Sequence, residues 1–306
     1  MSAKRTLIVI GGPTASGKTK AAVAIAQHFG TEVISADSRQ FYGAMRIGTA
    51  RPSTDELHGV PHHFIGHLDL SGMWSAGQFA RSAEPILQAL MDQYGIAVLV
   101  GGSGLYIDAL TKGLDPLPAT DPRLRERLQK RIDRNGIDDL LAELATLDPA
   151  THARIDKHNP HRVIRALEVC LITGKPFSAQ RSSPSDRTDI RIIRIALDLP
   201  RAELYKRIDD RVDRMIADGL VAEARDLLPF RDANALRTVG YRELFEHFDG
   251  SIDLPGAIAS IKQHTRNYAK RQQTWWRRDP SWVRFSPTEL AGMIAAIEQE
   301  LRKDQA

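Results

Sequence analysis

Residues 11–20 carry the clearest chemical signal in the chain. The stretch "GGPTASGKTK" follows the apolar run "LIVI" and precedes the alanine-rich "AAVAIAQHF". A glycine-rich turn between a strand and a helix directs backbone N–H groups and the positive end of the helix dipole at an anion. Lys18 adds a positive charge, and the Thr19 hydroxyl is an expected ligand of a Mg²⁺ ion that bridges phosphates. The pattern does not indicate which phosphate compound binds. It predicts a phosphate site made by Gly12, Pro13, Thr14, Ala15, Ser16, Gly17, Lys18 and Thr19.

A carboxylate follows the second apolar run. Asp37, in "ISADSRQFY", comes directly after the β-rich residues "EVIS", where its side chain is expected to face the cleft beside Lys18. A carboxylate in that place can act as a general base toward a hydroxyl or an amine. The alternative is a local role, in which Asp37 or Ser38 caps the turn formed by "RQFY".

The third apolar run ends in glycines instead of an acid. In ordinary nucleotide-hydrolysing enzymes with this kind of phosphate loop, the corresponding strand ends in an acid that holds the magnesium shell. Here "IAVLV" leads into "GGSG", residues 101–104. Ser103 offers a hydroxyl, and the glycines allow a bulky ligand to approach the backbone. This loop therefore counts against an ordinary nucleotidase.

Short β-rich runs alternate with helical patterns over residues 5–113. The runs "LIVIGG", "EVISADS" and "IAVLVGG" are separated by helical patterns from Gly17 and over residues 75–93, and a further helix is expected from Leu105. That alternation predicts a parallel sheet with crossover helices, an α/β fold. Ligands of such sheets bind at the carboxyl ends of the strands, so the three loops are expected to converge on one cleft.

A helical insertion is expected after the Pro-rich stretch "GLDPLPATDP", residues 113–122. Residues 122–179 have only helical patterns, "RSSPSDRTD" closes the block, and a strand pattern returns over residues 190–199. Helices are expected over residues 201–218 and 254–276 and from residue 287. We therefore predict a catalytic core of residues 1–117 and 189–306 and a helical insertion domain of residues 118–188.

Composition places few limits on function. The formal charge of +4 over 306 residues suits contact with a polyanion without requiring it. The only cysteine, Cys170, lies in the apolar stretch "ALEVCLI", so no disulfide framework is expected. The apolar run near the N-terminus is too short for a signal peptide, and no stretch reaches membrane-spanning length. We expect a monomeric cytoplasmic protein.

Two helical segments are rich in basic residues. Residues 262–278, "KQHTRNYAKRQQTWWRR", contain six Lys or Arg, no Asp or Glu and three aromatic residues, a combination that suits RNA phosphates and an unstacked base. The alternative is that Tyr268, Trp275 and Trp276 anchor the core. In "RIDDRVDRM", Arg211 and Arg207 lie one turn apart, and their alternative role is a solvated charged face with the neighbouring aspartates.

Two further clusters, one of arginines and one of histidines, can be explained by structural roles alone. In "NPHRVIRALEV", Arg162 and Arg165 share one helix face, and Arg165 can simply pair with Glu168. His58, His62, His63 and His67 are close in sequence, but Gly59 and Pro61 interrupt them and no helical frame with a catalytic glutamate surrounds them. We expect a loop that shapes a pocket there, not a zinc site.

In order along the chain come "GGPTASGKT", "ISADSRQFYGAMRIGTARP", "VPHHF", "LVGGSGLYIDALTKGL", "RVIRALEV", "RTVGYREL" and "YAKRQQTWWRR". With these motifs the chain resembles the bacterial tRNA dimethylallyltransferases, the IPP transferase family, from about residue 6 to residue 285. The resemblance implies a P-loop NTPase-like parallel sheet with helices on both faces and a helical insertion. It also implies transfer of a dimethylallyl group from dimethylallyl diphosphate to the exocyclic N6 amine of the adenosine immediately 3′ of the anticodon. The tRNAs concerned read codons that begin with U.

The resemblance also implies roles for residues. The phosphate loop holds the prenyl diphosphate with Mg²⁺ on Thr19, and the catalytic residues are Asp37 as the base, Lys18, Arg211 and Ser103. The insertion grips the anticodon stem-loop. The implied tRNA contacts are Asp37, Ser38, Arg39, Gln40, Ser103, Arg125, His161, Arg162, Val163, Ile164, Arg165, Arg237, Thr238, Val239, Gly240, Tyr241 and Arg242. One departure is visible, because the family often has threonine in place of Ser103.

Three other functions remain open at this point. An ATP-dependent small-molecule kinase shares the phosphate loop and an acid at Asp37. An adenylate isopentenyltransferase acts on free nucleotides, which would not need a helical insertion to grip a stem. An RNA-binding protein with a vestigial phosphate loop would not need Asp37.

Overall fold

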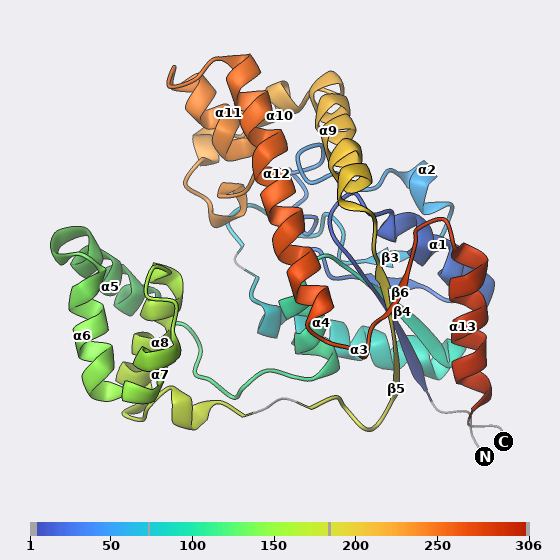
Figure 1. The fold of residues 1–306 in the computed structure, drawn as a ribbon, viewed down its shortest axis with the longest axis horizontal. Coiled ribbons are helices and arrows are strands. Elements are labelled where there is room, and N and C mark those ends of the chain that lie inside the picture. The colour runs from blue at the N-terminus through green and yellow to red at the C-terminus, as the bar shows by residue number, and fades with distance from the viewer. Residues whose placement is uncertain (1–4, 73, 183–184, 304–306) are drawn as a thin grey trace. The chain divides into compact units, whose positions relative to one another are not determined.

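The computed structural model describes residues 5–72, 74–182 and 185–303. The chain divides into two compact units, Met1–Thr111 together with Arg187–Ala306, and Lys112–Asp186 (Figure 1). The helical unit thus starts six residues before the expected boundary at 118 and ends two residues before the one at 188. Residues 183–184 of the closing segment "RSSPSDRTD" lie outside the described residues.

The first unit is built on a six-stranded parallel sheet with the order β3-β2-β4-β1-β5-β6. Its strands are β1 (Thr6–Gly11), β2 (Val33–Ser35), β3 (His62–His63), β4 (Ile96–Val100), β5 (Arg191–Leu197) and β6 (Val283–Phe285). The predicted parallel sheet is confirmed. The two edge strands β3 and β6 were not predicted, because two or three residues are too few to show a strand period.

Helices cover both faces of the sheet (Figure 1). Because side chains alternate along a strand, Ile8 and Ile10 pack with α1 (Lys18–Phe29) and α13 (Leu290–Arg302). Leu7 and Val9 pack on the other face with α3 (Ala76–Tyr94), α4 (Gly104–Thr111) and α12 (Leu254–Arg277). Both faces of these strands are buried, which explains why they appear in the sequence as continuous apolar runs.

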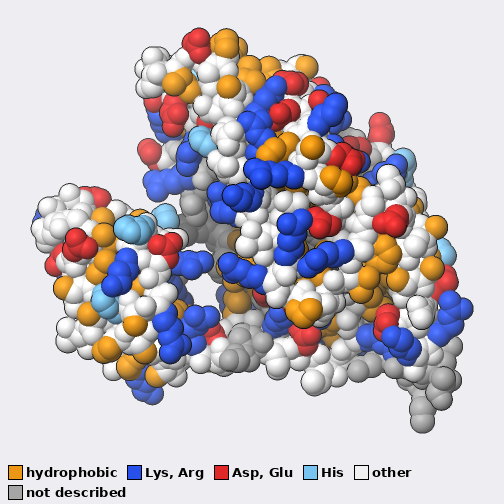
Figure 2. Space-filling model, viewed as in Figure 1, with side chains coloured by type: hydrophobic (Ala, Val, Ile, Leu, Met, Phe, Trp, Pro, Cys, Tyr) orange, Lys and Arg blue, Asp and Glu red, His pale blue; other side chains and the backbone are white. Residues whose placement is uncertain are grey.

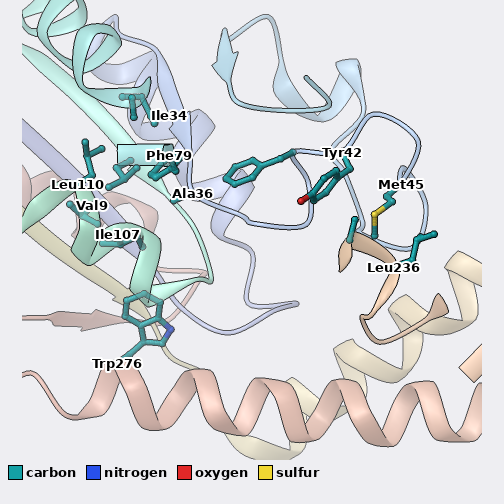
Figure 3. Close-up of a cluster of buried hydrophobic side chains, with 14 of the residues drawn as sticks. Val9, Ile34, Ala36, Tyr42, Met45, Phe79, Ile107, Leu110, Leu236 and Trp276 are labelled. Atoms are coloured by element: carbon teal, nitrogen blue, oxygen red, sulfur yellow. The ribbon is translucent and has the colours of Figure 1, made fainter. Parts of the chain in front are cut away.

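A long helix, α12, contributes to this second core (Figure 3). Trp276 points from α12 toward Val9 and Ile107, and its side chain is 3% exposed. The same cluster extends to the smaller elements of this unit. These are α9 (Arg201–Ala217), α10 (Leu220–Asp226), α11 (Tyr241–Phe248) and the short 3₁₀ turns Leu228–Phe230 and Asn234–Leu236. The short helix α2 (Thr54–Leu57) has no buried residue and does not belong to this cluster.

The second unit consists of helices. They are α5 (Pro122–Asn135), α6 (Ile137–Leu147), α7 (Pro149–Arg154) and α8 (Pro160–Thr173), followed by a 3₁₀ turn, Ser178–Gln180. Three of the helices begin with a proline after a residue whose side chain accepts a backbone N–H at the helix start, namely Asp121, Asp148 and Asn159. This arrangement of cap and proline is a strong helix start signal, since proline lacks the N–H that would be unpaired there.

None of the helices within the described ranges is long and apolar enough to cross a membrane.

Candidate active site

The loops after β1, β2 and β4 meet at one edge of the sheet. β4 lies between β1 and β2, and backbone hydrogen bonds continue past the strand ends, from Ala36 N to Val100 O (2.7 Å) and from Gly101 N to Ile10 O (3.1 Å). The predicted convergence of the three loops is therefore confirmed. It follows from the parallel sheet, in which neighbouring strands end at the same edge.

The phosphate loop has a shape that depends on its glycines. Gly12 has φ +146° and approaches β5 so closely that a Cβ there would lie 2.9 Å from the Leu197 carbonyl oxygen. Gly17 has φ +90° and precedes α1 without a side-chain cap, so the first N–H groups of this helix are not satisfied by a capping side chain. The buried hydroxyl of Ser16 has no hydrogen-bond partner among the described residues. These groups make the loop ready to receive an anion.

Two partly buried cations face this loop. Lys18 Nζ donates to the Pro13 carbonyl at 2.6 Å, and burial lowers the pKa of Lys18 to about 8, although the nearby Asp37 carboxylate opposes the shift. Arg211, from α9, donates to Thr14 Oγ1 at 3.2 Å, and burial lowers its pKa too. Two desolvated positive charges near one small acid favour a multiply charged anion.

The charged-face alternative for α9 is right for most of that helix and wrong for Arg211. Arg207 pairs with Glu203 (2.7 Å) and Lys206 with Asp210 (2.7 Å) in exposed intrahelical ion pairs. Arg211 points from the same helix to the phosphate loop. The helix therefore has one solvated side and one side that faces the site.

Asp37 is half-buried at the end of β2. Its Oδ1 accepts the backbone N–H of Arg39 at 3.1 Å, so the local turn role predicted as the alternative is present. Its charge affects the pKa of Lys18, Arg211 and Tyr268, which places the carboxylate among these side chains. The turn thus orients the acid toward the cleft and leaves its second oxygen available.

Hydroxyl groups lie beside the carboxylate. Ser103 Oγ is 3.3 Å from Ser38 Oγ, and the Ser103 side chain is also a neighbour of Tyr268 from α12. Burial and the Asp37 charge raise the pKa of Tyr268 to about 12, so this phenol stays protonated. The sequence predicts Tyr268 only as an aromatic residue that suits an unstacked base or anchors the core, and not as a neighbour of Ser103.

The two neighbouring tryptophans of α12 have different environments. Trp276 packs edge-on against Trp282 with ring centroids 4.7 Å apart, and it belongs to the core. Trp275 is 39% exposed, and its indole covers Gly104 so closely that any Cβ there would collide with it. The core alternative is therefore correct for Trp276, while Trp275 and Tyr268, 38% exposed, remain accessible to a ligand.

Lys and Arg side chains gather along α12 (Figure 2). Although residues 262–278 contain no acid, α9 and the loop after β5 supply several. Lys262 pairs with Asp213 (2.6 Å), Arg266 with Asp209 (2.6 Å), and Arg277 with Asp198 (3.3 Å). The exposed side chains without an ion pair among the described residues are Lys270, Arg271 and Arg278.

The expected tRNA stretches 37–40 and 237–242 are linked in space. Arg39 Nη1 donates to the carbonyls of Asn234 and Ala235, both at 3.1 Å. Arg237 and Arg242 are exposed. Tyr241 is instead fully buried, with its hydroxyl donating to Glu223 Oε1 at 2.6 Å.

Burial therefore corrects the prediction for the Tyr241 side chain, which belongs to the core. The neighbouring Gly240 is also buried, while Thr238 and Val239 are partly exposed. Gln40, the last residue of the first stretch, donates its side-chain amide to the carbonyls of Thr49 (3.2 Å) and Ala50 (3.1 Å). It thereby fixes the turn that follows.

In the helical unit, Glu168 organises the basic residues. This fully buried carboxylate accepts from Arg125 (2.9 and 3.0 Å), Arg165 (2.7 Å) and the backbone N–H of Asp121 (2.8 Å). The pairing of Arg165 with Glu168 predicted as the alternative is present, and both arginines keep part of their surface exposed. The residues of the predicted tRNA-binding stretch 161–165 therefore differ in their environments.

His161 and Arg162 are exposed at the start of α8. Val163 and Ile164 are buried in the core of the helical unit, so their side chains do not face solvent. The prediction of tRNA contact by these two side chains is corrected for the same reason as that for Tyr241, since an apolar helix face packs inward.

The histidine cluster does not form a metal site. His62 and His63 form edge strand β3, and His63 Nε2 lies 2.7 Å from Glu32 Oε2. His67 packs in an aromatic cluster with the rings of Phe41, Phe64 and Trp74. Among the described residues, no three His, Cys, Asp or Glu side chains gather in a way that could hold a metal ion.

The phosphate loop offers oxygen donors of the kind that Mg²⁺ prefers. Thr19 is partly exposed in the first turn of α1, and the unpartnered Ser16 hydroxyl belongs to the same loop. Mg²⁺ is commonly held by one or two protein oxygens together with substrate phosphates and water. The residues present therefore fit this ion.

Fold and site together define an α/β protein with a phosphate loop at the carboxyl edge of its parallel sheet. The IPP transferase family model matches residues 40–279. The chain belongs to this family.

Similar proteins cover nearly the whole chain. A tRNA dimethylallyltransferase of Christiangramia forsetii is 50% identical over 281 residues, which are 91% of this chain and 93% of that protein. A tRNA dimethylallyltransferase 1 of Bacteroides fragilis is 42% identical over 302 residues, 99% of this chain and 100% of that protein.

Solved structures agree with the fold. The tRNA isopentenylpyrophosphate transferase of Bacillus halodurans has a TM-score of 0.73 and 34% identity, with 99% of this chain and 98% of that chain covered. A eukaryotic dimethylallyltransferase, described as acting on tRNA, has a TM-score of 0.80 and 25% identity, with 97% of this chain and 78% of that chain covered.

Proposed function

We propose that this protein is a tRNA dimethylallyltransferase. It transfers the dimethylallyl group of dimethylallyl diphosphate to the N6 amine of the adenosine immediately 3′ of the anticodon, in tRNAs that read codons beginning with U, and releases diphosphate. The observation that carries the proposal is the convergence of Asp37, Lys18 and Arg211 on a phosphate loop in a chain of the IPP transferase family.

The donor's diphosphate binds at the phosphate loop. The N–H groups at the start of α1, the Ser16 hydroxyl and the partly buried charges of Lys18 and Arg211 are grouped at this loop. As the diphosphate leaves, negative charge grows on its bridging oxygen, and fixed cations in a desolvated site stabilise that charge. Lys18 and Arg211 are thus catalytic through the leaving group.

Asp37 acts on the acceptor. The adenine amine is a poor nucleophile because its lone pair is delocalised into the ring. As the new nitrogen–carbon bond forms, the carbon–oxygen bond of the donor breaks, its electron pair stays on the diphosphate, and Asp37 takes a proton from the amine. Ser103, which is hydrogen-bonded to Ser38 and lies next to Tyr268, offers a hydroxyl to the base.

Thr19 would hold a Mg²⁺ ion together with the diphosphate oxygens. When bound, the ion supplies positive charge to the leaving group without any need for proton transfer. No acid at the end of β4 is needed for this purpose, because the bond that breaks is carbon–oxygen and not phosphorus–oxygen.

The acceptor side suits RNA. Lys270 and Arg271 of α12 and Arg278 just after it are exposed and form no ion pair within the described part of the chain. Trp275 and Tyr268 offer flat surfaces near Ser103. An enzyme that modifies a base must take it out of its stack, and aromatic side chains stabilise such a base. Arg237, Arg242 and the turn 37–40 extend the contacts. The helical unit grips the anticodon stem-loop through His161, Arg162, Arg125 and Arg165.

The kinase alternative gains no support from the comparisons. A single reaction series distinguishes the two activities. Purified protein is incubated with Mg²⁺, an unmodified anticodon stem-loop RNA and either dimethylallyl diphosphate or ATP, and the digested nucleosides are analysed by mass spectrometry. The proposal predicts a dimethylallyl-sized gain on one adenosine with the prenyl donor only. No gain with the donor, together with phosphoryl transfer from ATP, would contradict it.

A further inference from the structure

We infer that Gln272 is a positioning residue that couples the binding of diphosphate to the binding of RNA. It does so by holding the phosphate loop, residues 12–19, at a fixed distance from the loop after β4, residues 101–104, which we call the acceptor loop. This inference rests on the proposed function. It concerns a residue of the basic helix α12 whose side chain turns away from the RNA-facing surface, being only 7% exposed.

The Gln272 carboxamide joins two loops that are distant in sequence. Its Oε1 accepts the backbone N–H of Thr14 in the phosphate loop at 2.8 Å. Its Nε2 donates to the carbonyl oxygen of Gly102, in the loop after β4, also at 2.8 Å. The bond to Gly102 is buried and the bond to Thr14 is partly buried, and the loss of a partner costs most where water cannot replace it.

Only a planar group with a donor and an acceptor at this length can make both bonds. A glutamate keeps the acceptor and loses the donor, and a methionine loses both. Gly102 is adapted to this contact, because any Cβ at this position would collide with Gln272 Nε2. Since Gly102 does not have a positive φ, close approach and not backbone conformation explains the glycine.

The two loops held by Gln272 carry opposite sides of the reaction. Thr14 is fixed twice, by Gln272 at its N–H and by Arg211 at its hydroxyl. Its N–H is therefore occupied, and the anion is received by the later part of the loop, residues 15–19. Gly102 directly precedes Ser103, which lies beside Asp37 and the acceptor. The carboxamide thus sets the distance from leaving group to base.

Its place on α12 connects Gln272 to RNA. Tyr268 and Trp275 lie one turn before and one turn after it, and both contact the acceptor loop, at Ser103 and at Gly104. RNA that binds Tyr268, Arg271 and Trp275 therefore restrains α12, and through Gln272 it restrains Thr14 of the phosphate loop. Diphosphate that orders the phosphate loop acts back on the same helix, and such coupling is reciprocal.

The test compares Gln272→Met and Gln272→Glu with the matched control Gln273→Met. Gln273 is the next residue of the same helix, and its amide reaches Asp198 at 3.3 Å instead of either loop. Three quantities are measured in the full chain: the single-turnover prenyl-transfer rate at saturating donor and RNA, the affinity for inorganic diphosphate with and without stem-loop RNA, and the melting temperature.

In the wild-type protein and the control, bound RNA is expected to change diphosphate affinity by about fivefold or more. In Gln272→Met this change disappears and the saturated rate falls by roughly 10²-fold, because misplacement by about 1 Å is enough for such a loss. Gln272→Glu, which keeps the bond to Thr14, falls between the two.

The inference is overturned if the Gln272 variants keep both the wild-type rate and the coupling, or if their only defect is a lower melting temperature. It is also overturned if the wild-type protein shows no coupling. A wild-type protein without transferase activity in the same assay would instead contradict the proposed function, so the two failures are distinguishable.

Discussion

Three ionisable side chains with different environments carry the chemistry at the residue scale. Lys18 and Arg211 are desolvated cations whose pKa values burial lowers, and Asp37 is a half-buried acid between them. Neither cation has a carboxylate in salt-bridge contact among the described residues. The imbalance is what a site for a departing diphosphate requires, since the ligand supplies the missing negative charge.

Replacement of Asp37 by asparagine tests its role as the base. Asn keeps the acceptor for the Arg39 N–H and loses the ability to take a proton, so we expect kcat to fall by about 10²–10⁴-fold. The affinity for tRNA should be largely retained, which separates chemistry from binding. Asp232→Asn, at an exposed position, is the control. A full rate with Asp37→Asn would show that another group removes the proton.

The pKa of Lys18 predicts a pH dependence of anion binding. In the ligand-free protein this amine loses its proton near pH 8, well below its ordinary value. Below pH 8 it is charged and attracts diphosphate. Above pH 8 binding must also take up a proton, so the affinity should fall by up to about tenfold per pH unit.

Titration calorimetry with inorganic diphosphate checks this dependence. Lys18→Arg keeps its charge throughout the range, and its ratio to the wild-type protein removes the ionisation of diphosphate itself. A constant ratio between pH 7 and pH 10 would contradict a lowered pKa of Lys18.

The candidate site was predictable residue by residue where a local pattern encodes it. The phosphate loop and Asp37 stand directly after strands, so their placement follows from the sheet. Gln272 and Tyr268 could not be predicted in the same way, because they lie in a basic helix far along the chain. Their roles depend on which side of α12 faces the loops, and only tertiary packing decides that.

At the scale of elements, a buried acid, Glu168, connects two helices of the helical unit. Glu168 of α8 accepts four hydrogen bonds from Arg125, Arg165 and the Asp121 N–H. Burial alone would raise the pKa of this carboxyl group, but the donors together outweigh it and lower the pKa. Glu168 thereby links the start of α5 to α8 and fixes the orientation of the guanidinium groups of Arg125 and Arg165. An apolar helix face alone would not fix these guanidinium groups.

Replacement of Glu168 by alanine should destabilise the helical unit by about 3 kcal/mol, because it leaves buried donors without a partner. Amide hydrogen exchange in α5 and α8 of the full chain should become roughly 10²-fold faster. Glu126→Ala removes an exposed ion pair with Lys130 in the same unit and should leave exchange unchanged. Equal protection in the Glu168 variant would contradict the anchoring role.

The direction of the Glu168 pKa also fixes the sign of a pH effect. Because its pKa in the folded protein is lowered, the stabilisation is present above the ordinary pKa of glutamate and is lost as pH falls below that value. Exchange in α5 and α8 should therefore accelerate under acid conditions in the wild-type protein more than in Glu168→Ala.

Elements were predictable where caps and periods agree. The bounds of α3 and α12 lie within one or two residues of the expected 75–93 and 254–276. The helix expected from residue 287 begins at Leu290, since β6 and a turn precede it. The short α10 and α11 carry too few residues for a clear period, and packing around Tyr241 decides their position.

At the scale of the whole molecule, RNA recognition combines exposed charges from separate stretches of sequence. The affinity for an anticodon stem-loop should fall linearly with the logarithm of salt concentration, with a slope of about −0.7 to −0.9 per phosphate contacted. Donor binding involves one small anion and should depend on salt much less. The comparison is made by fluorescence anisotropy at several salt concentrations.

Two arginines of α12 refine this prediction. Arg271 has no ion pair among the described residues, whereas Arg266 pairs with Asp209 at 2.6 Å. Arg271→Ala should reduce the salt slope by about 1, because one phosphate contact is lost. Arg266→Ala should change it less. Equal slopes in Arg271→Ala and the wild-type protein would show that Arg271 does not contact phosphate.

The central claim is that the phosphate loop holds a leaving diphosphate while a carbon–oxygen bond breaks. The most direct measurement uses dimethylallyl diphosphate with a heavy oxygen isotope between carbon and phosphorus, unmodified tRNA and Mg²⁺, followed by mass spectrometry of both products. The account predicts prenylated adenosine beside the anticodon, an equal amount of released diphosphate, and all of the heavy isotope in that diphosphate. Unmodified adenosine, or heavy oxygen retained with the prenyl group, would contradict it.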